Sequence, residues 1–220
     1  MEIITKKLSY LLILLVSSYG FSQTARVQVI HNSPDALASE VDVYLNDEIL
    51  IDNFKFRTAS PFIDAPAGAP IKIDIAPAGS SSSAESIYSV SPTLAVGSTY
   101  VIVANGIVSP TGYNPAPAFG LEIFDQGREV ASNASNTDVL VNHGSPDAPT
   151  VDVVETSVPA GTIINDLSYP MFTDGYLELP TSDYILEVRD ATGTVVVASY
   201  SAPLQTLGLQ GKALTVVASG

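Results

Sequence analysis

The side chains that could do chemistry are concentrated in a short motif that occurs twice. The pattern Val-x-His-x-Ser-Pro-Asp-Ala begins at Val29 and again at Val141. Histidine, serine and aspartate are the residue types of a hydrolytic triad, in which a base activates a hydroxyl nucleophile. The motif therefore raises the hypothesis of a hydrolase. Its residues are His31, Ser33, Pro34 and Asp35 in the first copy and His143, Ser145, Pro146 and Asp147 in the second.

The spacing of the motif favours a structural role over catalysis. Residues two apart on one strand share a face at a spacing of about 6.6 Å, whereas a triad collects its members from separate segments. His31 would continue the apolar face of Val27 and Val29, the proline would end the strand, and the serine and aspartate would bond backbone groups in the turn. We therefore expect no catalytic residue here and a protein that is not an enzyme.

Composition argues against several other kinds of site. The 220 residues include no cysteine, no tryptophan and two histidines, so thiol chemistry, disulfides and multi-histidine metal sites are not expected. The net charge of −14 repels a phosphate backbone, so nucleic acid is not an expected partner. The carboxylates could bind calcium, although none has the spacing of a calcium loop. We expect no cofactor, with calcium as the one that the composition permits.

A proline-rich loop offers one candidate binding residue. Tyr113 stands between Gly112 and Asn114, with Pro115 and Pro117 following. An aromatic ring in an exposed loop could stack on a sugar or hold a peptide. The alternative is that the tyrosine packs on the edge of the fold and stiffens the loop.

The elements that must position these residues are short β-strands. Apolar residues alternate with polar ones, as in Ile71, Ile73 and Ile75 with Lys72 and Asp74 between them, and period-two alternation indicates half-buried strands. Turn sequences separate the strands, and no segment after the N-terminal region has a sustained helical period. The pattern predicts an all-β protein of antiparallel, immunoglobulin-like β-sandwiches with about seven strands each.

Internal repetition predicts two such domains in tandem. The His-x-Ser-Pro-Asp motif recurs 112 positions later, and Val41-Asp42-Val43 recurs as Val151-Asp152-Val153. We expect sandwich repeat 1 over residues 24–130, a linker over 131–137 and sandwich repeat 2 over 138–220. The second repeat has no counterpart of Phe119–Phe124, which we interpret as the last strand of the first. It is therefore expected to lack its last strand and to leave an unpaired edge, unless the native chain continues past Gly220 or a neighbouring chain supplies that strand.

The N-terminus has the pattern of a secretory signal peptide. Lys6 and Lys7 precede the apolar stretch Leu8–Val16, and small and polar residues follow to Gln23. We predict a signal peptide over residues 1–23. The apolar stretch is shorter than the roughly 20 residues of a spanning helix, so no transmembrane segment is expected. The protein is predicted to be secreted, or to lie at the cell surface or in the periplasm of a bacterium.

The repeated motif, the Val-Asp-Val-Tyr sequence at Val41–Tyr44 and the Val-Ala-Asn-Gly sequence at Val103–Gly106 resemble domain-of-unknown-function family 4397. The second copy departs from the pattern at Asn142, Gly144 and Val154. The resemblance implies secreted or cell-surface bacterial β-sandwich modules, often in tandem. It implies no catalytic residue.

Together these features predict a non-enzymatic extracellular module that acts as a structural or adhesive spacer. Its partners would be neighbouring domains or an extracellular ligand. The first alternative is a carbohydrate- or peptide-binding module that uses Tyr113, and the second is a hydrolase centred on His31.

Overall fold

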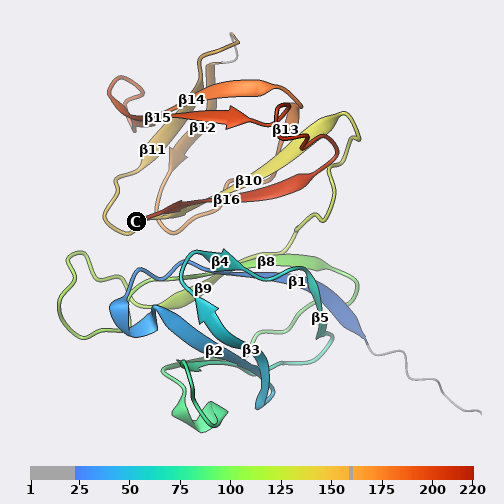
Figure 1. The fold of residues 1–220 in the computed structure, drawn as a ribbon, viewed down its shortest axis with the longest axis vertical. Coiled ribbons are helices and arrows are strands. Elements are labelled where there is room, and N and C mark those ends of the chain that lie inside the picture. The colour runs from blue at the N-terminus through green and yellow to red at the C-terminus, as the bar shows by residue number, and fades with distance from the viewer. Residues whose placement is uncertain (1–22, 159–160) are drawn as a thin grey trace, which may run out of the picture.

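The chain folds into two all-β lobes stacked along its long axis (Figure 1). The structure is a computed structural model that describes residues 23–158 and 161–220. The predicted signal peptide lies outside these ranges except for Gln23. Two short 3-10 helices, η1 (Ala36–Ala38) and η2 (Ser83–Glu85), are the helical elements of the described residues. None of the helices in the described ranges has the length and apolarity needed to cross a membrane.

The first lobe is built from two sheets that face each other. One has the strand order β4-β1-β8-β9, with β5 also paired to β1, and the other has the order β3-β2-β6-β7. Strands β1 and β8 run parallel, and the other pairs are antiparallel. The strands are β1 (Thr24–His31), β2 (Glu40–Leu45), β3 (Glu48–Lys55), β4 (Thr58–Ala59), β5 (Ile63–Pro66), β6 (Ile73–Pro77), β7 (Tyr88–Val90), β8 (Thr99–Asn105) and β9 (Gly120–Phe124).

The second lobe has a similar arrangement, but within the described residues the sheet that contains β10 has three strands where the sheet that contains β1 has five. Its sheets have the orders β13-β10-β16 and β12-β11-β14-β15. Strands β10 and β16 run parallel, as β1 and β8 do. In the part of the chain that the structure describes, no strand pairs with β16 as β9 pairs with β8. The strands are β10 (Asn136–Gly144), β11 (Val151–Glu155), β12 (Gly161–Leu167), β13 (Leu177–Pro180), β14 (Asp183–Asp190), β15 (Val196–Pro203) and β16 (Ala213–Ser219).

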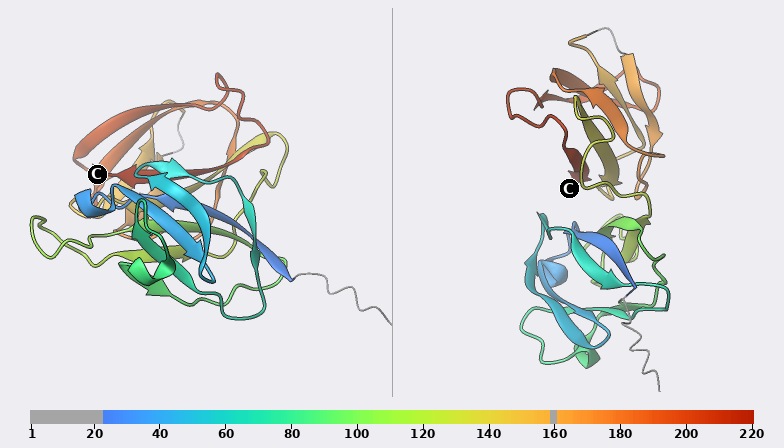
Figure 2. Two further views of the ribbon diagram at one scale, coloured as in Figure 1. Left: turned by 60° about the horizontal axis from the view of Figure 1, so that its bottom comes forward. Right: turned by 90° about the vertical axis from the view of Figure 1, so that its right-hand side faces the viewer.

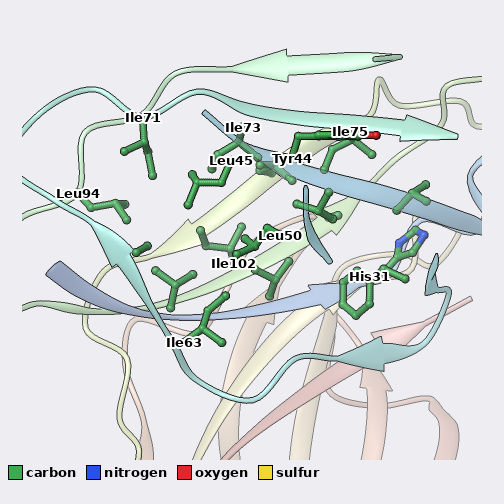
Figure 3. Close-up of a pocket in the computed structure, with 18 of the residues that line it drawn as sticks. His31, Tyr44, Leu45, Leu50, Ile63, Ile71, Ile73, Ile75, Leu94 and Ile102 are labelled. Carbon is green, nitrogen blue, oxygen red and sulfur yellow. The ribbon is translucent and has the colours of Figure 1, made fainter. Parts of the chain in front are cut away.

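The core of the first lobe lies between its two sheets. Alternate residues of each strand point inward, and Figure 3 shows Ile73 and Ile75 of one sheet facing Ile63 and Ile102 of the other. A cavity of about 40 Å³ remains among these side chains, and its lining is apolar apart from His31 and the hydroxyl of Tyr44. A space of this size and character is a packing defect rather than a chamber for a large ligand.

The repeated Val-Asp-Val sequence fixes a bulge in the neighbouring strand. Asp42 is fully buried and accepts hydrogen bonds from the backbone N–H of Asn53 (2.9 Å) and from the N–H and hydroxyl of Ser80 (2.9 and 2.7 Å). Asn53 has a φ of 53° and lies where the β2–β3 register shifts. In the second lobe Asp152 accepts from the N–H of Asp166, which also has a φ of 53°. The aspartate therefore holds a left-handed residue that the bulge requires.

Replacing Asp42 should destabilise the first lobe. Burial alone would raise the pKa of Asp42, but the bonds from Asn53 and Ser80 outweigh burial and hold the pKa below its usual value. Asp42→Ala leaves those donors without an acceptor and is expected to lower the free energy of unfolding by about 2–4 kcal/mol, measured by urea denaturation. The control Glu48→Ala, at an exposed position on the same hairpin, should change it by less than about 0.5 kcal/mol. Equal effects for the two variants would contradict this assignment.

Candidate functional site

His31 lies at the end of β1 with both ring nitrogens engaged. It is 1% exposed, and its Nε2 is 2.6 Å from the carbonyl oxygen of Ala38. A carbonyl can only accept, so Nε2 carries the proton, and Nδ1 accepts a long hydrogen bond from the N–H of Ser33 (3.4 Å). Burial lowers the pKa of His31. The ring is therefore neutral and is packed beside Phe54 and Phe56.

Ser33 and Asp35 fasten the motif loop to the segment that leaves β8. The hydroxyl of Ser33 donates to the carbonyl of Gly106 (2.6 Å). Asp35 accepts from the N–H of Val108 (2.8 Å) and from the N–H and hydroxyl of Ser109 (both 2.6 Å). Its carboxylate also caps η1 by accepting from the N–H of Leu37. Burial alone would raise the pKa of Asp35, but these hydrogen bonds outweigh burial and lower it.

The three triad residue types do not form a relay in this loop. The proton of Ser33 is committed to Gly106, and the carboxylate of Asp35 is committed to Leu37, Val108 and Ser109. No hydrogen bond in the described residues joins the side chains of His31, Ser33 and Asp35 to one another. Pro34 is half-buried between them in the loop. The geometry can hold two backbone segments together.

The second copy of the motif makes fewer contacts. His143 is also 1% exposed and has its Nε2 3.0 Å from the carbonyl of Pro149, but its Nδ1 has no hydrogen-bond partner within the described residues. Ser145 donates to the carboxylate of Asp147 (3.0 Å). Asp147 is exposed and Pro146 is half-buried. The two copies therefore differ most at the aspartate, which is buried in the first and solvated in the second.

Tyr113 is attached to the first motif loop. Its side chain is half-buried, and its hydroxyl accepts a hydrogen bond from the N–H of Ala36 (2.7 Å). This contact ties the proline-rich loop to the start of η1. The hydroxyl is thereby held beside the first motif loop, and sugar binding by the ring stays a prediction.

A chain of buried asparagine amides joins the two lobes. The Nδ2 of Asn32 donates to the Oδ1 of Asn105 and to the backbone carbonyl of Gly144, both at 2.7 Å. Asn105 donates to the Oδ1 of Asn142 (3.3 Å), and Asn142 donates to the carbonyl of Pro170 (2.7 Å). All three asparagines are at most 2% exposed. Buried amides are stable only where they are hydrogen-bonded, so this network fixes one arrangement of the lobes.

Apolar packing surrounds this network. The outward faces of β1, β8 and β9 meet the β10 sheet and the segment before β13. Phe124 lies against the rings of Phe172 and Tyr176, with centroid separations of 5.5 and 5.9 Å. We call the asparagine network and this cluster together the joint. The apolar members of the joint are Ile30, Val101, Val103, Phe124 and Leu140, with Phe62, Phe172, Tyr176 and Val217 packed against them.

Charged groups close one end of the joint. Arg128, after β9, forms ion pairs with the buried Asp138 (2.5 Å) and with Glu178 (2.7 Å) of the second lobe. Its guanidinium also lies over the ring of Tyr176, and its backbone N–H donates to the Tyr176 hydroxyl. At the other end Arg57 donates to the carbonyl of Ser219 (3.0 Å). The contacts between the lobes thus span apolar, amide and ionic groups.

The joint explains why the two motif copies differ, a link that the sequence did not reveal. Ile30 and Asn32 of the first copy correspond to Asn142 and Gly144 of the second. A Cβ atom on Gly144 would lie 2.2 Å from the Nδ2 of Asn32. A second asparagine at that position would therefore collide with the first. The differences between the copies were visible in the sequence, but their meaning depends on the two copies being in contact.

The described residues contain no group of three or more histidine, aspartate or glutamate side chains arranged to hold a metal ion. Asp35 and Asp42 bind backbone N–H groups, and Asp138 pairs with Arg128.

Comparison with known protein families identifies the class of the chain. The model of the family described as "Domain of unknown function (DUF4397)" matches residues 25–154, so the chain belongs to this family. The match covers the first lobe and continues through β10 and β11 of the second. A comparison with curated proteins found no match.

The two motif aspartates should differ in their contribution to stability. Asp35→Ala removes the acceptor for donors on three residues and is expected to lower the free energy of unfolding by about 2–4 kcal/mol at pH 7. Asp147→Ala is the matched control and should change it by less than about 0.5 kcal/mol. Because the folded-state pKa of Asp35 is lowered, its contribution is present above the unfolded-state pKa and is lost as the pH falls through the folded-state value. The difference in urea midpoint between wild type and Asp35→Ala should therefore be smaller at pH 3 than at pH 7, and a difference that is the same at both pH values would contradict the role assigned to the carboxylate.

A methyl group at Gly144 should disturb the joint. Gly144→Ala forces the amide of Asn32 away from the Gly144 carbonyl and is expected to cost about 1–3 kcal/mol. The control is Gly175→Ala, where an added Cβ meets nothing within 4 Å. Combining Gly144→Ala with Asn32→Ala should recover part of the loss, because the colliding amide is then absent. Purely additive losses in this double-mutant cycle would show that the two residues do not interact.

Proposed function

We propose that the chain is a secreted, non-enzymatic module in which two tandem, immunoglobulin-like copies of the family act together as a stiff structural or adhesive spacer. The second copy, on this proposal, is a divergent one whose differences serve the contact with the first. The observation that supports the proposal best is the joint. Two domains connected only by a flexible linker would not bury three asparagine amides between them.

The proposed location rests on sequence features. Residues 1–23 have the pattern of a signal peptide, and the chain has no cysteine and a net charge of −14. A net charge far from zero keeps a protein soluble and separate from other chains, which suits a location outside the cell.

The non-enzymatic part of the proposal rests on the motif geometry. Ser33 faces a backbone carbonyl, and the His31 ring is desolvated with both nitrogens occupied. A nucleophile needs a base within hydrogen-bond reach of its hydroxyl. On this proposal Ser33 and Asp35 act instead by hydrogen-bonding the loop after β1 to the segment after β8.

Stiffness can be measured on residues 24–220. Residual dipolar couplings recorded for the two lobes should fit one common alignment tensor, because the joint holds them as one body. The variant Asn32→Ala with Phe124→Ala should need two tensors of different magnitude, while each lobe keeps its own fold. Asn114→Ala, on the exposed proline-rich loop, is the control and should retain a single tensor. Independent tumbling of the two wild-type lobes would refute the proposal that the chain is a stiff spacer.

Hydrolysis is tested separately. Ester and peptide substrates incubated with the wild-type protein should show no turnover above that of Ser33→Ala. Saturable hydrolysis that Ser33→Ala abolishes, with an unchanged melting temperature, would refute the spacer proposal and support the hydrolase hypothesis.

The sugar-binding alternative is tested on a glycan array with wild type and Tyr113→Ala. It requires a binding signal in the wild type that is lost when the tyrosine ring is removed.

A further inference from the structure

Strand β9 carries a free backbone edge on the first lobe. It is the last strand in the order β4-β1-β8-β9, and the chain continues from it toward β10. The carbonyl of Ala104 accepts a hydrogen bond from the loop after β1, and peptide groups alternate in direction along a strand, so those of Val103 point to β9. Glu122 lies opposite Val103 and points back to β8. The N–H and C=O groups of Leu121 and Ile123 therefore point toward the free edge.

The other edge strands of the first lobe carry features that discourage strand addition. Natural proteins blunt their sheet edges with bulges, prolines or short strands. The pairing of β2 with β3 has two register shifts. Strand β4 has two residues, β7 has three, and β5 ends in Pro66. The β8–β9 pairing, by contrast, has five consecutive residue pairs without a shift. Among the described strands of the first lobe, β9 thus offers the regular edge that can template another strand.

The two faces of β9 differ in character. Leu121 packs against the core of the first lobe, and Ile123, on the same face, is 40% exposed. Glu122 lies on the opposite face, together with Phe124, which belongs to the joint. Side chains of an added strand would alternate in the same way. Apolar residues would fit beside Leu121 and Ile123, and a residue of another kind would lie beside Glu122.

The carboxylate of Glu122 has no cation beside it. Its side chain is half-buried, and it takes part in none of the ion pairs that the described residues form. Burial raises the pKa of Glu122, and burial together with the charge of Glu122 raises the pKa of Tyr169 in the second lobe. Arg128, at the end of the joint, is already paired with Asp138 and Glu178. A half-buried carboxylate without a cation is the complement of a lysine or arginine side chain.

We propose that the free edge of β9 is a strand-addition site for an extended segment of another protein in which a lysine or arginine stands between two apolar residues. The segment would run antiparallel to β9, the direction with the more stable pairing. Its apolar side chains would lie beside Leu121 and Ile123, and its basic side chain beside Glu122. Main-chain hydrogen bonds supply affinity in this mode of recognition, and side chains supply selectivity. The proposal adds a partner class to the spacer and does not depend on the spacer being stiff.

The charge of β9 itself disfavours a second copy of this chain as the occupant. Two β9 strands that pair Leu121 of each copy with Ile123 of the other would place the two Glu122 side chains directly opposite each other. Like charges in this position destabilise a strand pair. β9 contains no basic residue that could take the place of one glutamate. The occupant is therefore a segment of a different protein.

A fluorescein-labelled peptide of the sequence Ser-Thr-Val-Lys-Val-Thr-Ser, blocked at both ends, is the probe. When its lysine lies opposite Glu122, the two valines lie opposite Leu121 and Ile123 and exchange hydrogen bonds with them, whereas the lysine N–H points away from β9. N-methylation of either valine should therefore weaken binding to residues 24–220 about tenfold, and N-methylation of the lysine should change it by less than about twofold. These measurements use the unaltered protein.

Charge variants test the basic position of the segment. Glu122→Gln removes the carboxylate and should weaken binding of the lysine peptide about fivefold to tenfold. A peptide with glutamine in place of the lysine should bind wild type and Glu122→Gln equally within about twofold. Glu48→Gln, at an exposed position on β3, is the control for general attraction between a basic peptide and an acidic protein, and it should leave binding of both peptides unchanged.

Backbone variants locate the site on β9. Ile123→Pro removes an N–H that faces the free edge and should abolish binding, while Ile123→Val keeps that N–H and should retain binding. Circular dichroism and the melting temperature establish that both variants are folded. Absence of saturable binding, equal effects of valine and lysine N-methylation, or equal losses for Glu122→Gln and Glu48→Gln would overturn the proposal. A dimer in sedimentation that Ile123→Pro converts to a monomer would also overturn it, because a second copy would then occupy the edge.

Discussion

Each lobe depends on the parallel pairing of its first strand with a strand far along the chain. β1 pairs with β8, and β10 pairs with β16, in matching registers. This pairing places His31 beside Ala104 and the motif loop beside Gly106. Because the loop ends there, Ser33 and Asp35 can bond the segment that leaves β8. The hydrogen bonds of the motif thus hold together two strands that are far apart in the sequence. Bringing such strands together costs chain entropy, and these contacts offset that cost.

The two faces of the paired strands have different tasks. The inward face, with Val27, Tyr100 and Ile102, forms the core of the first lobe. The outward face, with Ile30, Val101 and Val103, forms the joint. Strands buried on both faces have no face left for solvent, and this explains why β8 is apolar along most of its length. Figure 2 shows the two lobes meeting through these sheets when the molecule is turned.

The joint also explains how two copies of one sequence pattern came to differ. The lobes meet through equivalent sheets, so equivalent residues approach one another across the contact. Asn32 donates to the carbonyl at position 144 and leaves room there for glycine alone. The isoleucine at position 30 is matched by an asparagine at 142, which completes the amide chain instead. Side-chain divergence at a nearly symmetric contact therefore produces one complementary interface rather than two competing ones.

The sequence by itself determined the all-β class and the position of individual strands. Alternation at Ile71, Ile73 and Ile75 predicted the inward face of a strand, and all three are buried. The segment Phe119–Phe124 was correctly interpreted as a strand, since β9 begins at Gly120. Such features follow from local rules, because alternation and turn residues act over a few positions.

Only the tertiary structure decided which strands are neighbours and what the polar residues bind. Alternation reports which residues share a face but not which strand pairs with which, so the parallel β1–β8 pairing and the joint could not be derived from it. The same limit applies to Asn32, whose amide acquires its meaning from Gly144 and Asn105 across the joint. The buried hydrogen bonds of this protein join segments that are distant in sequence, and their partners are fixed by packing.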